Sequence, residues 1–175
     1  MKVLTFLLVA VILASSAAAQ APQSTAKQMA ALNFLIGDWE GDGWITMGPG
    51  PKRTFHQTEH VQSKLRGELL LIEGLGHSTE DTSRVVHTAL AIISYDPGQS
   101  RYHMRAYSTG GKFIDADVTV KDSSYAWSMD DPSAGTIRYT IGLNDKRQWD
   151  EVGEASRDKG ATWSKFFEMT LDRKK

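Results

Sequence analysis

The stretch that decides the fold is NFLIGDWEGDGWI, residues 33–45, where an apolar run meets three glycines, two tryptophans and three carboxylates. Such a mixture is typical neither of a plain helix nor of a plain strand. Residues 24–36, which overlap the start of this stretch, predict a helix. Thr25 and Gln28 can form a capping box, and the apolar residues can form one stripe. Gly37 then supplies the helix stop. We interpret the stretch as the junction between a short helix and a first strand that begins near Trp39.

The sequence after Gly37 has the pattern of short strands separated by turns. The turns are rich in Gly, Pro, Asn and Asp and have hairpin lengths. No connection has room for the crossover helix that a parallel pair of strands needs. An antiparallel meander is therefore expected, with ten strands at roughly 39–47, 52–62, 67–78, 85–95, 100–108, 112–120, 123–130, 135–143, 147–155 and 162–171.

A meander of this length favours a closed barrel. An open sheet would leave two long edges exposed to aggregation, whereas closure removes them; a sandwich is the alternative. The predicted fold class is all-β, a closed antiparallel barrel of about ten strands with the short N-terminal helix capping one end. Trp39 would plug that end, and Gly41 and Gly43 would let the first strand bend. Ten strands should also leave an internal space.

The first nineteen residues, MKVLTFLLVAVILASSAAA, have the layout of a secretory signal peptide. One lysine precedes an apolar stretch, which is followed by small residues that end at Ala17 and Ala19. The apolar stretch is shorter than the roughly 20 residues that span a bilayer. We expect a mature chain of one barrel domain, residues 20–175, that is secreted or periplasmic and has no stable membrane insertion. A retained anchor is the alternative.

The composition excludes several functional classes. The chain has no cysteine, so disulfides, thiolate metal sites and cysteine nucleophiles are absent. Its formal net charge is −1, and its basic residues gather only in the closing DRKK, which argues against a nucleic-acid partner. Neither a nucleophile elbow, a zinc-protease helix nor a phosphate-binding loop appears, so no residue is predicted to be catalytic.

Gly37, Asp38 and Trp39, placed after a helix, resemble the opening of the calycin barrels, which include lipocalins and fatty-acid-binding proteins. With ISYDPGQSRYHMRAYSTGG and TLDRK, the pattern resembles a family of small, mostly bacterial exported proteins of unknown function, itself similar to the nitrobindin-like haem-binding barrels. The lipocalin resemblance implies that Arg173 stacks on Trp39. Nitrobindin-like proteins ligate haem through a histidine near the C-terminus, but this chain has none after His103. We therefore expect neither haem nor another cofactor.

Strand alternation suggests which side chains face the internal space. With two-residue turns at 109–110 and 121–122, Arg105 lies opposite Ile114. The second turn places Ala116 opposite Trp127. The ligand-binding candidates on this face are then His103, Arg105, Tyr125, Trp127 and Met129. Because a buried guanidinium needs an anion, the expected ligand is a small amphipathic molecule such as a fatty acid or another apolar carboxylate. Alternatively, Arg105 pairs with a nearby acid, or this face is the outer one.

Pairs of histidine and aspartate residues on the predicted strands suggest two other kinds of site. His56 and His60 share a strand face about 13 Å apart, too far for one zinc ion, and no metal site is predicted. Asp115 and Asp117 have a spacing that suits an acid and base pair, but their strand alternates like one with its polar side in water. The predicted function is an exported binding protein for a small hydrophobic or amphipathic ligand. The alternatives are an enzyme with an acid/base site in the barrel, or a haem- or metal-binding barrel.

Overall fold

The computed structural model describes residues 24–46, 48 and 50–175. They begin with a helical segment, α1 (Ala26–Met29), which continues as the 3-10 helix η1 (Ala30–Leu35). The helix predicted at 24–36 is thus present, although mostly in the tighter 3-10 form. Thr25 makes no side-chain cap, so the predicted capping box is wrong. The predicted signal peptide, residues 1–19, lies outside the described residues. In the part of the chain that is described, no helix is long and apolar enough to cross a membrane.

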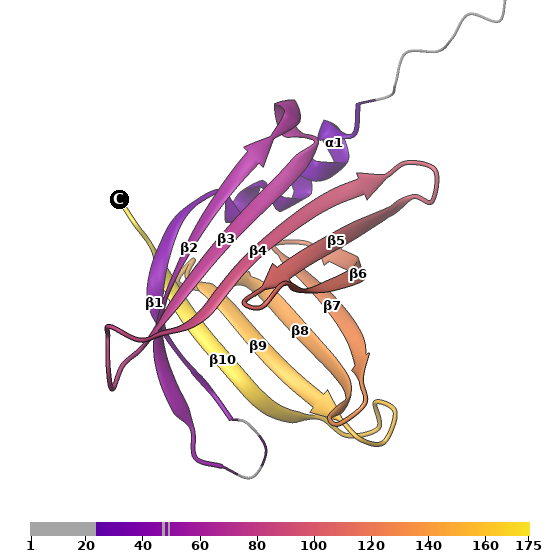
Figure 1. The fold of residues 1–175 in the computed structure, drawn as a ribbon. Helices are drawn as coiled ribbons and strands as arrows, with labels where there is room; N and C mark the ends of the chain where they lie inside the picture. The colour runs from indigo at the N-terminus through magenta and orange to yellow at the C-terminus, as the bar shows by residue number, and fades with distance from the viewer. Residues whose placement is uncertain (1–23, 47, 49) are drawn as a thin grey trace, which may run out of the picture.

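Ten antiparallel strands follow within these described residues, and β1 pairs with both β2 and β10, which closes the barrel (Figure 1). The predicted fold class is therefore confirmed. A short 3-10 helix, η2 (Leu65–Gly67), joins the second and third strands. The strands are β1 (Gly37–Ile45), β2 (Arg53–Lys64), β3 (Leu69–Ser78), β4 (Val85–Asp96), β5 (Arg101–Ser108), β6 (Lys112–Lys121), β7 (Ser124–Asp131), β8 (Gly135–Leu143), β9 (Trp149–Ser156) and β10 (Ser164–Arg173).

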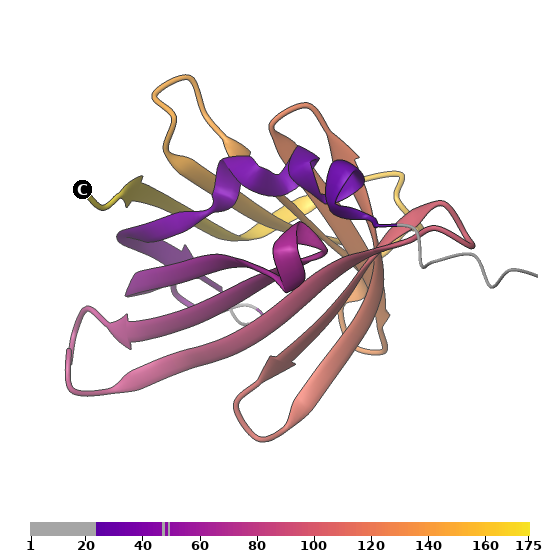
Figure 2. The same cartoon turned by 90° about the horizontal axis from the view of Figure 1, so that it is seen from above.

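The helical segment closes one end of the barrel, and Trp39 lies beneath it. Seen from above, the segment lies across the ring of strands (Figure 2). Trp39 is fully buried, donates its indole N–H to the Leu35 carbonyl at 2.8 Å, and packs edge-on against Trp149 at a centroid distance of 5.8 Å. Met29 and Leu32 are also buried in this core. Truncating a tryptophan buried in this way typically costs about 3 to 5 kcal/mol.

Arg173 ties the end of the last strand to the helix. Its guanidinium carbon lies 4.0 Å from the centre of the Trp39 ring, which is the contact that the lipocalin resemblance implies. The same guanidinium donates a hydrogen bond to the Phe34 carbonyl at 2.7 Å and another to the Ile36 carbonyl. Gly37 has a φ of 136°, and a Cβ there would lie 2.5 Å from Arg173 Nη1. Glycine is thus required both by the backbone conformation and by the approach of the arginine.

Candidate ligand site inside the barrel

The inward-facing side chains are buried at the helix end of the barrel and only half-buried towards the other end. Inward-facing residues near the helix, such as Leu70, Ile93 and Ile141, are buried. On the same inner face, the positions nearer the opposite mouth are only half-buried, although the strands surround them. Solvent therefore reaches the inside of the wall. These half-buried inner positions are Ile45, Ala89, Ala91, Ala106, Ile114, Trp127, Met129, Tyr139 and Phe167.

An aromatic wall lines part of this open half. Trp127 stacks on Tyr139 at 4.7 Å between ring centroids, Tyr139 meets Phe167 edge-on at 5.5 Å, and Phe167 stacks on Phe55 at 5.6 Å. Tyr139 and Phe167 lie on β8 and β10, with β9 between them. They meet across Gly153, where a Cβ would lie 2.9 Å from each side chain. A flat apolar molecule would find a continuous aromatic surface there.

A polar cluster lies deeper, between the aromatic wall and the Trp39 plug. Gln57 and Glu59, both on β2, are buried, and Gln57 Nε2 donates a hydrogen bond to Glu59 Oε1 at 2.7 Å. Two glycines of β3 make room for them: a Cβ at Gly74 would lie 2.6 Å from Glu59 Oε1, and one at Gly76 would lie 2.5 Å from Gln57 Oε1. The glycines therefore allow two polar side chains to turn inward on β2.

Glu151, on β9, faces the same interior as Glu59. It accepts a hydrogen bond from the Trp149 indole N–H at 3.1 Å. Burial, reinforced by the charge of Glu151, raises the pKa of Glu59 to about 8 against the opposing hydrogen bond from Gln57. Burial likewise raises the pKa of Glu151 to about 7. The pKa of the Tyr125 hydroxyl is raised well above its ordinary value by burial and by both carboxyls. The cluster therefore retains protons at neutral pH.

Several oxygens of these acidic groups have no protein partner. Among the described residues, the side-chain polar atoms that are both sealed from solvent and without a hydrogen bond are Gln28 Oε1 and His103 Nδ1. Tyr125 is only 5% exposed, and its hydroxyl makes no hydrogen bond to a described residue. The same holds for the second carboxyl oxygens of Glu59 and Glu151. These three oxygens are consequently not sealed from solvent, and they have unused hydrogen-bonding capacity.

The predicted register of β5 against β6 is wrong by one residue. Arg105 pairs with Asp115 instead of Ile114, because the connecting loop has three residues, 109–111. The Gly111 N–H donates to the Ser108 carbonyl at 3.1 Å across this loop. A slip of one residue exchanges the two faces of a strand. His103 and Arg105, predicted to line the cavity, therefore lie on the outer face.

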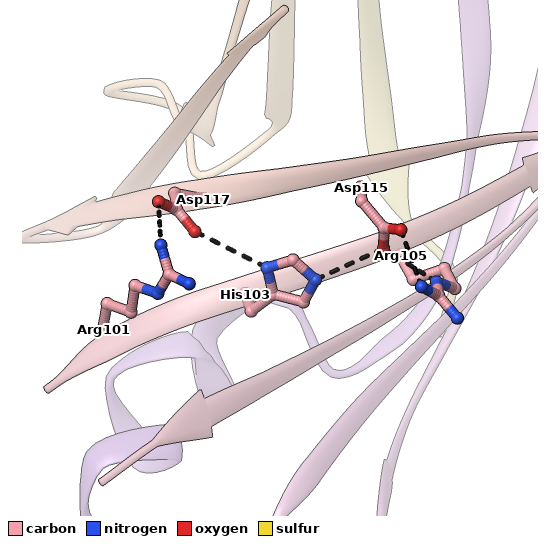
Figure 3. Close-up of polar contacts among 5 residues, drawn as sticks. All are labelled: Arg101, His103, Arg105, Asp115 and Asp117. Atoms are coloured by element: carbon pink, nitrogen blue, oxygen red, sulfur yellow. Dashed lines mark hydrogen bonds and ion pairs between the residues drawn. The ribbon is translucent and has the colours of Figure 1, made fainter. Parts of the chain in front are cut away.

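On that outer face, a charged stripe runs over β5 and β6 (Figure 3). Arg105 donates two hydrogen bonds to Asp115, at 2.7 and 2.6 Å, and Arg101 lies 2.5 Å from Asp117. His103 lies between the two carboxylates, 3.3 Å from Asp115 and 3.5 Å from Asp117. The hydrogen bonds from Arg105 hold the pKa of Asp115 below its ordinary value. The pairing of Arg105 with a nearby acid, considered as an alternative, is the arrangement found.

The β6–β7 hairpin keeps the predicted faces although its register also differs. Trp127 pairs with Val118 instead of Ala116, because the turn consists of residues 122–123. A difference of two residues preserves the face. Tyr125 accordingly faces inward and is buried, and Trp127 and Met129 face inward and are half-buried. Their contact with a ligand stays a prediction.

The outer wall also carries a groove of about 620 Å³ over β1, β2 and β3, bordered by Asp38, His60, Glu73 and Lys174. Asp38 and His60 contact each other, and Lys174 pairs with Glu40 at 2.5 Å. The charged side chains that border the groove are thus partly paired with other side chains on the outer face. We place the candidate site inside the barrel, where aromatic side chains are half-buried and the pKa values of two carboxyls are raised.

The residues do not fit haem bound as in nitrobindin-like barrels. The inner face of β10 carries Phe167, Met169 and Leu171, none of which has an imidazole. His87 on β4 pairs with the inward-facing Gly76 but is exposed, and partial desolvation lowers its pKa. Among the described residues, no group of three or more His, Asp or Glu side chains is placed to hold a metal ion.

Comparisons with known proteins support the fold. No protein-family model matches the chain, and no curated protein matches it in sequence. Among solved structures, it is similar to Rv2717c from M. tuberculosis, with a TM-score of 0.62 and 12% identity over 88% of this chain and 100% of that one. It is also similar to the S-type phycobiliprotein lyase CPES from Guillardia theta, with a TM-score of 0.57 and 9% identity over 87% of this chain and 94% of that one. At these identities the likeness shows a shared calycin-like barrel fold.

Proposed function

We propose that the chain is an exported binding protein that holds a small hydrophobic or amphipathic molecule in the open half of its barrel. The observation that carries this proposal is the ring of half-buried apolar side chains inside the wall, closed at one end by the helix and Trp39. Each Å² of apolar surface that a ligand removes from water there contributes about 25 cal/mol. The likeness to a phycobiliprotein lyase is compatible with such a binding role.

The position of Arg105 removes the reason for expecting a carboxylate ligand. A fatty acid was expected because Arg105 was predicted to face the cavity, but Arg105 lies outside with Asp115. The deep polar groups of the interior are carboxyls and a phenol. A neutral amphiphile therefore fits the interior better than a fatty acid.

Filling the hollow provides the test of binding. Ala91 faces inward on β4 and pairs with Ala106 on β5, whereas its neighbour Leu90 faces outward beside Tyr107. Wild type and Leu90→Trp should bind the neutral dye Nile red saturably, and Ala91→Trp should lose binding. Ala106→Phe provides a smaller filling change. Unchanged dye binding in both inward variants, or its loss in Leu90→Trp alone, would contradict the proposal.

Export is proposed from residues 1–19 alone. Expression of the full sequence in a Gram-negative host should yield a periplasmic or secreted product with a mass that corresponds to cleavage before Gln20. Cytosolic material of full mass would contradict this part of the proposal.

An enzyme with an acid/base site stays the alternative. The raised pKa values of Glu59 and Glu151 favour the interior over the outer stripe as its place, because a carboxyl that titrates near neutrality can both donate and accept a proton. A turnover that Glu151→Gln abolishes without lowering the melting temperature would raise this alternative above simple binding. The absence of haem stays a prediction, which the visible absorption spectrum of the purified protein tests.

A further inference from the structure

Three oxygen-bearing side chains from distant parts of the chain face one another in the interior. Glu59 comes from β2, Tyr125 from β7 and Glu151 from β9. Each carboxyl is close enough to raise the pKa of the tyrosine, and Glu151 is close enough to raise the pKa of Glu59. Tyr125 and Glu151 flank Ile141 on neighbouring strands. Glu59 pairs with Trp39, whose ring contacts Trp149, the residue that donates a hydrogen bond to Glu151.

These groups are poorly satisfied by the protein itself. Glu59 receives one hydrogen bond from Gln57 and Glu151 receives one from Trp149, which leaves an oxygen of each without a partner among the described residues. The hydroxyl of Tyr125, a residue that is 5% exposed, makes none. Acceptor oxygens that no protein donor reaches are hydrogen-bonded to water or to a ligand. A single group with several N–H donors could satisfy all three oxygens.

The charges of the interior favour a cation as that group. Glu59 and Glu151 hold protons near neutral pH, and a cation placed between them would favour their ionised, hydrogen-bond-accepting form. Arg105 is outside with Asp115, and Arg173 is engaged with the helix carbonyls and the Trp39 ring. Partial desolvation lowers the pKa of His87, which disfavours a positive charge on that side chain. The aromatic wall would add cation–π attraction along the entry path.

We propose that the interior takes a small amphipathic amine, with its ammonium group between Glu59, Glu151 and Tyr125 and its apolar part against the aromatic wall. This inference rests on the proposed function, since it specifies the ligand class for the same hollow. The ammonium offers three N–H donors, one for each of the three oxygens. Recognition is by hydrogen bonds and charge, and no covalent step is involved.

The test compares n-octylamine, n-octanol and n-octanoate as competitors for bound Nile red near pH 7.5. These molecules share one apolar tail and differ only in the head group. Octylamine should displace the dye at least tenfold more strongly than octanol, and octanoate should be the weakest. Glu151→Gln and Glu59→Gln should each remove most of the advantage of the amine while leaving octanol displacement within about twofold. Glu73→Gln, on the outer face of β3, is the matched control and should behave as wild type.

Two results would overturn the amine inference while leaving the binding function intact. One is equal displacement by octylamine and octanol. The other is strongest displacement by octanoate. Failure of all three compounds and of the dye itself to bind would overturn the proposed function as well. An amine advantage that survives in both glutamine variants would also contradict the proposed site.

Discussion

Replacing Glu59 by glutamine should make the barrel more stable at alkaline pH and leave it almost unchanged at about pH 4. The folded chain holds the Glu59 carboxyl at a pKa of about 8, against an ordinary value of 4.5. Between these values the folded state binds more protons than the unfolded state. The contribution of the protonated Glu59 to the free energy of unfolding is therefore fully present below pH 4.5, and it is lost as the pH rises through 8.

The magnitude follows from the shift. Each pKa unit corresponds to about 1.4 kcal/mol, so a rise from 4.5 to about 8 amounts to on the order of 4 kcal/mol at pH 8. Glutamine cannot ionise, and its side-chain carbonyl can still accept the hydrogen bond from Gln57. The difference in unfolding free energy between variant and wild type should therefore grow from near zero at about pH 4 to several kcal/mol at about pH 8.5.

Urea unfolding followed by tryptophan fluorescence at several pH values between these limits measures that difference directly. Glu73→Gln serves as the control, because Glu73 is exposed on the outer face of β3. A difference that stays flat across the pH range would refute the reasoning. Greater destabilisation of Glu59→Gln at high pH than at low pH would refute it as well, because it would reverse the sign.

Three further predictions concern the plug, the inner glycines and the outer stripe. Trp39→Ala should lower the unfolding free energy by about 3 to 5 kcal/mol in urea titrations, because the indole is fully buried; a loss below about 1 kcal/mol would contradict its role as a plug. Gly74→Ala should cost about 1 to 3 kcal/mol, since its Cβ would lie 2.6 Å from Glu59 Oε1, and the added variant Glu59→Ala should recover part of that loss. Arg105→Ala should leave Nile red affinity unchanged, because the side chain lies outside with Asp115; a loss of affinity would mean that the outer face takes part in binding.

Much of the architecture could be predicted because turn chemistry is local. Glycine, proline and aspartate mark the strand ends, and short connections permit only antiparallel neighbours, which leads to a closed meander. The predicted strand bounds agree with the observed ones within a few residues. The junction at Gly37 also behaves as its residues suggest, since the helix stops there and Trp39 turns into the core.

The face of β5 could not be predicted in the same way. The sequence Thr109, Gly110 and Gly111 allows a loop of two or three residues, and the difference decides whether Arg105 faces in or out. Both glycines adopt left-handed backbone angles, with φ of 84° and 73°, in the longer loop. Glycine tolerates either geometry, so loop length is set by the sheet and not by the local residues.

The interior acids were missed because β2 is polar on both faces. In the run from Phe55 to Val61, the inward Gln57 and Glu59 alternate with outward polar residues. The alternation therefore does not show which face of the strand points into the barrel. A signal did exist in the following strand. Gly74 and Gly76 recur at the same period within an otherwise apolar strand, as expected where side chains of a neighbouring strand need room.

The central claim is that the half of the barrel away from the helix is hollow and accepts an apolar molecule. A crystal structure of the protein with 8-bromooctan-1-ol, located by the anomalous signal of bromine, tests it most directly. We expect a bromine peak inside the barrel wall, bordered by Trp127, Tyr139 and Phe167. An interior without bromine, in which these side chains meet the opposite strands across the axis, would contradict it.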